Sequence, residues 1–213
     1  MLKIYNTLSK TKEKFIPLNQ NAVKMFVCGP TVYDYIHVGN ARTFVFFDVV
    51  GRYFEFKGFE LNYVQNITDI DDKIITRAHA ENKKPEEIAL EYKTVFIEDM
   101  GSLKVTAVSN YASASEHIVE IIAQVQTLIH KGYAYTAPAI QAKGPDAIEV
   151  KPQSEKPQSE NNKGNNDVYF ELARYEKDFP DQYGTLSGQK LDELKEGSRV
   201  EMEANKLNPR DFV

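Results

Sequence analysis

Residues 23–43, "VKMFVCGPTVYDYIHVGNART", indicate the fold class of this chain. The first seven of these residues, 23–29, form an apolar run typical of a buried strand, and a Gly-Pro pair ends that run. Over residues 39–58, apolar side chains recur at spacings of three and four, which predicts an amphipathic helix that ends at Gly58. The stretch therefore predicts a strand, a glycine-containing turn and the start of a helix.

The sequence on either side extends this unit. Residues 60–68, "ELNYVQNIT", alternate in polarity and predict a second strand. A helix that connects two strands favours a parallel unit of a nucleotide-binding sheet. Residues 69–103 contain two helical patterns, with Pro85 in the first turn of the second. Residues 2–8 can form a short strand, and residues 115–133 predict an amphipathic helix with Ser115 as its N-cap.

Composition limits the class of protein. The chain has 213 residues, a net charge of −5 and a single cysteine. The acidic balance argues against a global basic field for nucleic acid, although a local basic face is compatible with it. One cysteine excludes an internal disulfide and favours a reducing compartment. Because the sequence has no run of 18 apolar residues and no secretory signal pattern, we expect a soluble, cytoplasmic protein.

A low-complexity segment interrupts the second half of the chain. Residues 137–166 contain few apolar side chains and carry the tandem repeat "KPQSE" at 151–155 and 156–160. Such a segment buries too little apolar surface to offset its ordering entropy, so we expect a disordered insertion. Order is expected to resume at residues 167–172, "DVYFEL".

Two motifs in the opening stretch could carry chemistry. Gly39 and Asn40 lie at a helix start, where small residues and the helix dipole favour phosphate, and His37 could donate a hydrogen bond to a phosphoryl oxygen. The alternative is an ordinary loop with a structural histidine. Cys28 is either a small core residue or, at the carboxyl end of a strand, a nucleophile or metal ligand. No second cysteine completes a closed zinc site.

A third motif is the acidic segment "NITDIDDKI", residues 66–74. Its three aspartates could bind Mg²⁺ or the ammonium group of a substrate. Alternatively, Thr68 or Asp69 could simply cap the helix that follows.

Five ordered blocks resemble, in order along the chain, the amino-terminal part of cysteinyl-tRNA synthetases, which are class I aminoacyl-tRNA synthetases. The blocks are residues 2–15, 25–43, 46–75, 183–201 and 208–213. The resemblance implies an α/β fold in which residues 1–115 form the first half of a class I Rossmann-type parallel-sheet nucleotide-binding domain. It also implies a small α+β connective insertion at residues 116–210 and the start of a returning catalytic strand at 211–213.

The same resemblance implies ATP-dependent activation of L-cysteine to cysteinyl-adenylate, followed by transfer to tRNA(Cys). Residues 37–40, "HVGN", stand where class I enzymes carry His-Ile-Gly-His. It further implies that Zn²⁺ binds the substrate thiolate and that Mg²⁺ accompanies ATP. The residues implied by position are His37 and Asn40 for catalysis, Pro30, Thr31, His37, Val38, Gly39 and Asn40 for ATP, Gly29, Thr31 and Thr68 for the substrate cysteine, and Cys28 for zinc.

Several parts of the family pattern are not found among these 213 residues. They are the remaining zinc ligands, the Lys-Met-Ser-Lys-Ser loop and the helical domains that bind tRNA. We therefore expect the chain by itself to fold marginally and to be inactive, and we expect the full-length protein to be a monomer. Two other functions stay open: a ligase that joins cysteine to an amino sugar, and a noncatalytic remnant that binds RNA or a partner protein.

Overall fold

The computed structural model describes residues 2–138, 166–187, 206–208 and 210–212. The chain divides into two compact units, Met1–Tyr5 with Lys12–Glu120, and Asn6–Thr11 with Ile121–Val213. The "KPQSE" repeats and most of the segment expected to be disordered lie outside the described residues.

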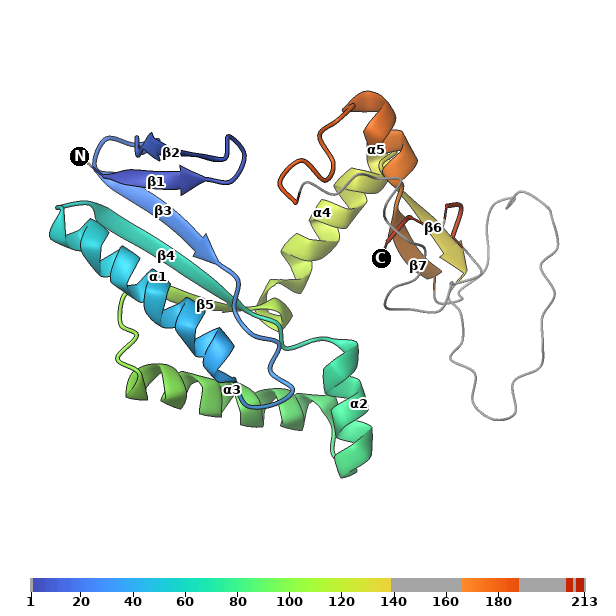
Figure 1. Cartoon of the computed structure of the whole chain (residues 1–213). Helices are drawn as coiled ribbons and strands as arrows, with labels where there is room; N and C mark the ends of the chain where they lie inside the picture. Colours follow the sequence, from blue (N-terminus) through green and yellow to red (C-terminus); the bar gives the residue numbers. More distant parts are fainter. Residues whose placement is uncertain (1, 139–165, 188–205, 209, 213) are drawn as a thin grey trace. The chain divides into compact units, whose positions relative to one another are not determined.

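The first unit is built on the predicted strand, helix and strand. β3 (Ala22–Val27), α1 (Val38–Phe56) and β4 (Glu60–Ile67) follow one another along the chain, and β3 pairs with β4 in parallel (Figure 1). In this register Val27 lies opposite Gln65, so the two strands end at the same edge of the sheet. The predicted α/β fold with a parallel sheet is confirmed.

A third strand, β5 (Asn110–Ser113), extends the sheet in the order β3-β4-β5. It pairs with β4 in parallel, with Val64 opposite Asn110. We did not predict β5 from the sequence. Its four residues, "NYAS", contain no run of β-branched side chains, and its position is defined by hydrogen bonds to β4 instead.

Two helices connect β4 to β5. α2 (Asp72–Glu81) and α3 (Pro85–Ser102) confirm the two helical patterns, and Pro85 is the first residue of α3. The N-cap of α2 is Asp71, whose carboxylate accepts a hydrogen bond from the backbone N–H of Lys73 at 2.9 Å. The alternative in which Thr68 or Asp69 caps this helix is therefore wrong.

Two hydrophobic clusters form the core of the first unit. The main core cluster takes side chains from α1, α2, α3 and β4, and a smaller cluster joins Val27, Tyr63 and Ala107. Phe26, which precedes Val27 on β3, is 62% exposed. The buried members of the main cluster are Val32, Phe44, Ile67, Ile74, Ala78, Ile88, Ala89, Tyr92, Phe96, Met100 and Val105.

A buried carboxylate ties α1 to the loop before β5. Asp48 is only 1% exposed, and its Oδ1 accepts hydrogen bonds from the backbone N–H groups of Thr106 (2.6 Å) and Ala107 (2.7 Å). Its Oδ2 pairs with the guanidinium of Arg52 at 2.7 Å. Three donors thus satisfy a charge that would be costly to bury alone.

Tyr63 should make the stability of this core fall at alkaline pH. Its side chain is fully buried, and no described residue accepts a hydrogen bond from its hydroxyl. Burial, with smaller contributions from Tyr111 and Asp48, raises the pKa of Tyr63 to about 12. The folded protein therefore holds this proton more tightly than the unfolded chain, whose tyrosine pKa is about 10.

The contribution of Tyr63 is fully present below pH ~10 and is lost as the pH rises towards the folded pKa. We expect the free energy of unfolding of Tyr63→Phe to fall less steeply than that of the wild type above pH ~10. Denaturant unfolding of both proteins across this range measures the difference. Parallel slopes would show that Tyr63 keeps its ordinary pKa in the folded state.

The helix predicted at residues 115–133 begins differently from the prediction. A 3₁₀ turn, η1 (Ala114–His117), precedes α4 (Ile118–His130). Ser115 lies inside this turn and its hydroxyl bonds to Asp69, so the prediction that Ser115 is the N-cap of an α-helix was wrong.

Within the described ranges, no helix combines the length and the apolar character needed to cross a bilayer.

The second unit contains an antiparallel pair, β6 (Ala134–Pro138) and β7 (Asn166–Phe170), followed by α5 (Leu172–Asp178). Phe212, in the segment expected to begin a returning catalytic strand, forms an antiparallel bridge with Phe170 of β7. The adjacent Asp211 is 2% exposed and accepts hydrogen bonds from Tyr135 Oη and the Leu172 amide.

A separate two-stranded sheet near the N-terminus consists of β1 (Lys3–Asn6) and β2 (Thr11–Lys14).

Candidate active site

The turn after β3 lies against the end of β4. The backbone N–H of Gly29 donates to Oδ1 of Asn66 at 2.9 Å, and Nδ2 of Asn66 donates to Oγ1 of Thr68 at 3.3 Å. One carboxamide thus links two residues that the sequence analysis assigned to the same substrate pocket. The role of Asn66 was not predicted from the sequence, because its partner Gly29 lies 37 positions away.

Backbone hydrogen bonds join the same two segments. Thr31 and Thr68 form an isolated parallel bridge. The amide of Thr68 donates to the Pro30 carbonyl at 3.0 Å, and the amide of Val32 donates to the Thr68 carbonyl at 3.1 Å. The structure therefore brings together Gly29, Pro30, Thr31 and Thr68 at the carboxyl edge of the sheet, where open α/β sheets bind their ligands.

His37 is the N-cap of α1. Its Nδ1 accepts hydrogen bonds from the amides of Gly39 (3.0 Å) and Asn40 (3.3 Å), and Oδ1 of Asn40 accepts from the His37 amide (3.2 Å). These contacts form a reciprocal capping box in which a histidine takes the place usually held by Ser or Thr. The role of His37 as a cap was not predicted, because imidazole is an uncommon capping group.

The cap has a chemical consequence. A neutral imidazole whose Nδ1 accepts hydrogen bonds carries its proton on Nε2. His37 is exposed, so this Nε2–H can donate to a ligand at the helix N-terminus. The amides of Gly39 and Asn40 are already engaged by the ring, whereas no described residue accepts from the amide of Val38. His37 Nε2–H, Val38 N–H and the Nδ2 hydrogens of Asn40 are therefore donors that the helix start offers.

Gly39 is required by this geometry. A Cβ at position 39 would lie 2.8 Å from Cε1 and 2.9 Å from Nδ1 of His37. A side chain there would push the ring off the helix end. The glycine in "HVGN" thus lets the imidazole fold back onto its own helix.

Cys28 follows β3 and is exposed. The alternative in which Cys28 is a packed core residue is therefore wrong. Within the part of the chain that the structure describes, no three His, Cys, Asp or Glu side chains converge closely enough to hold a metal ion. Of the nearby aspartates, Asp71 caps α2, and Asp69 binds Ser115.

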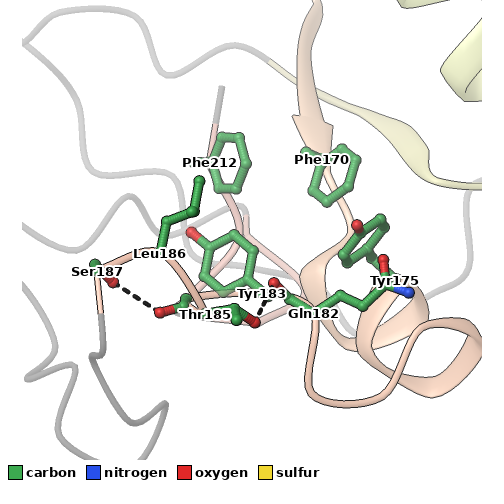
Figure 2. A pocket seen from close by; sticks show the side chains of 9 residues that line it. Phe170, Tyr175, Gln182, Tyr183, Thr185, Leu186, Ser187 and Phe212 are labelled. Atoms are coloured by element: carbon green, nitrogen blue, oxygen red, sulfur yellow. Dashed lines mark hydrogen bonds between the residues drawn. The ribbon is translucent and has the colours of Figure 1, made fainter. Parts of the chain in front are cut away.

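Two cavities lie elsewhere. One, of about 510 Å³, opens between α2, α3 and η1 and is lined partly by Asp69, Lys93 and Ser115. The other, of about 410 Å³, lies in the second unit, where Figure 2 shows Phe170, Tyr175 and Tyr183 with Phe212 around it. Neither contains a residue assigned to ATP, cysteine or zinc by the sequence analysis. Those residues lie between the end of β3 and the first turn of α1, and directly after β4.

A parallel sheet with a small-residue turn and a capped helix start at its carboxyl edge is the arrangement with which many α/β proteins bind nucleotides. Residues 14–213 match the family model described as "tRNA synthetases class I (C) catalytic domain", and the chain belongs to this family.

Relatives and a solved structure agree with this family. The chain is 47% identical over 212 residues to a cysteine–tRNA ligase of Carboxydothermus hydrogenoformans and 44% identical to one of Pyrococcus horikoshii. It aligns along its whole length but spans only 39% and 38% of those two relatives. Mycobacterium tuberculosis methionyl-tRNA synthetase in complex with methionyl-adenylate shares the fold, with a TM-score of 0.54 over 73% of this chain and 33% of that one, at 13% identity.

Proposed function

We propose that this chain is the amino-terminal part of the catalytic region of a cysteine–tRNA ligase. Such an enzyme activates L-cysteine with ATP and transfers it to tRNA(Cys). The observation that carries the proposal is the 41–47% identity to cysteine–tRNA ligases along the whole chain. Residues 1–115 would then belong to the catalytic domain and 116–210 to a connective insertion, in a protein that works as a cytoplasmic monomer.

In the activation step, the carboxylate of cysteine attacks the α-phosphorus of ATP. A bond forms between that carboxylate oxygen and phosphorus, and the bond from phosphorus to the pyrophosphate oxygen breaks. Negative charge builds up on the α-phosphoryl oxygens during this step, and we expect His37 Nε2–H and Val38 N–H to donate hydrogen bonds that stabilise it. Asn40 Oδ1 is engaged by the His37 amide, which leaves its Nδ2 hydrogens to donate to ATP.

The amino-acid pocket would lie beside this donor group. The hydroxyl of Thr68 accepts a hydrogen bond from Asn66 Nδ2, so its own hydrogen can be donated to the substrate. Gly29 and Thr31 are joined to the Asn66–Thr68 segment by the bonds described above. The backbone pairing fixes the distance between the two walls of the pocket, which supports its use for positioning.

An exposed thiol at the carboxyl end of β3 fits a zinc ligand. Cys28 would supply one soft ligand, and the remaining ligands would come from parts of the protein outside the described residues. Bound zinc supplies an open coordination position that prefers a thiolate to a hydroxyl, which separates cysteine from serine. Mg²⁺ would enter with ATP as part of the substrate.

The proposal is tested on the full gene product that carries this chain. We expect about one zinc per subunit, cysteine-dependent ATP–pyrophosphate exchange and aminoacylation of tRNA(Cys), with serine disfavoured by roughly 10⁴-fold. Cys28→Ser keeps the shape of the side chain but replaces thiolate by hydroxyl, and should lose both zinc and the discrimination against serine.

The outcomes separate the alternatives. Cysteine-dependent exchange without aminoacylation of tRNA would favour a ligase that joins cysteine to another acceptor, such as an amino sugar. Absence of both zinc and exchange would contradict the proposed activity and favour a noncatalytic binding protein.

A further inference from the structure

Asp69, the residue after Thr68, is held by both of its carboxylate oxygens. Oδ1 accepts from the backbone N–H of Ser115 at 2.9 Å, and Oδ2 accepts from the Ser115 hydroxyl at 2.5 Å. The two residues are 46 positions apart, so this contact joins the end of β4 to η1. Charge-assisted hydrogen bonds of this kind are about twice as strong as neutral ones.

A lysine of α3 anchors the η1 side of the contact. Lys93 Nζ donates to the hydroxyl of Ser113 at 2.7 Å and to Glu116 at 3.3 Å. Ser113 is fully buried and pairs with Ile67 in the sheet. Ser115 thus lies between two residues that α3 and β5 already fix, and it offers Asp69 a rigid partner.

Thr68 is consequently held from two directions. Its backbone amide and carbonyl are bonded to the Pro30–Val32 turn, and its neighbour Asp69 is bonded to η1. The peptide group between them has little freedom to rotate. If Asp69 were released, the Thr68 backbone would keep only its bonds to the turn after β3, and its hydroxyl only the bond from Asn66 Nδ2.

We propose that Asp69 is a positioning residue for the amino-acid pocket, acting through Ser115 to orient Thr68. This inference rests on the proposed function, because Thr68 matters here as a contact of the substrate cysteine. Asp69 does not act as a helix cap, since Asp71 has that role for α2. Nor does the geometry assign it to metal binding, since both of its oxygens are used within the protein.

The test compares two aspartates that lie two positions apart. In the full gene product, Asp69→Ala should raise the KM for cysteine in pyrophosphate exchange by roughly 10-fold or more, with the KM for ATP changed less than about twofold. Asp69→Asn keeps an acceptor for the Ser115 amide and should stay close to the wild type. Asp71→Ala removes a cap of similar strength and should leave the KM for cysteine unchanged.

Amide hydrogen exchange gives a second readout that does not depend on activity. The Thr68 and Val32 amides bridge the two segments, so both should exchange faster in Asp69→Ala than in Asp71→Ala. Equal effects of Asp69→Ala on the KM for cysteine and for ATP would overturn the inference. If the wild type shows no cysteine-dependent exchange, the proposed function fails, and the positioning role is then decided by the amide data alone. Unchanged protection of the Thr68 amide in Asp69→Ala would overturn the positioning role. Loss of that protection in Asp69→Ala but not in Asp71→Ala would support it.

Discussion

Replacing His37 by alanine should lower the rate of cysteine-dependent pyrophosphate exchange by about 10²–10³-fold in the full gene product. The imidazole Nε2–H is the donor that we expect to meet the phosphoryl oxygen as its charge develops. The same change removes the N-cap of α1, which should lower the free energy of unfolding by about 1 kcal/mol. Steady-state exchange and denaturant unfolding measure the two losses separately.

His37→Asn separates the cap from the chemistry. Asparagine is among the best N-cap residues, and its side-chain oxygen can accept from the amides that His37 Nδ1 now holds. Stability should therefore return to within about 0.5 kcal/mol of the wild type. The exchange rate should remain low, because the carboxamide is shorter than the imidazole and does not reach the position of Nε2. If His37→Asn restored both properties, the ring would act only as a helix cap.

The part of the fold that could be predicted from the sequence is the part in which local patterns are strong. The β3–α1–β4 unit combines a short apolar strand, a helical period of apolar residues and a glycine at position 58 that adopts φ 84°, so local and global preferences agree there. β5 has no such local signal. Its four residues become a strand because β4 offers them an edge, which only the folded chain reveals.

The candidate site divides in the same way. The placement of His37, Gly39 and Asn40 at a helix start followed from local pattern, and the resemblance to a family supplied their expected roles. The contacts of Asn66 and Asp69 could not be predicted, because their partners lie 37 and 46 positions away. Asp69 looked like a helix cap because aspartate before a helix usually is one. Here a closer competitor, Asp71, occupies the cap, and Asp69 remains available to Ser115.

Gly29→Ala should disrupt the candidate site more than any other single methyl group. A Cβ at position 29 would overlap the backbone carbonyl oxygen of Asn66 and lie 3.2 Å from Cγ of Gln65. Because the overlapping atom belongs to the backbone of a central strand, it cannot move aside as the end of a flexible side chain could. The turn after β3 must separate from β4, and the hydrogen bond from the Gly29 amide to Asn66 is then lost.

We expect Gly29→Ala to lower the free energy of unfolding by about 3 kcal/mol, the upper end of the cost of overpacking. Cysteine-dependent exchange should fall by roughly 10²-fold, since a shift of about 1 Å in a positioning group has that effect. Gly101→Ala is the matched control: a Cβ there meets no atom within 4 Å, and the glycine lies in α3. That change should stabilise the protein by about 0.5–1 kcal/mol through helix propensity and leave exchange unchanged. If both variants behaved alike, glycine would not be required at position 29, and the close approach of the two strand ends would not be what orders the site.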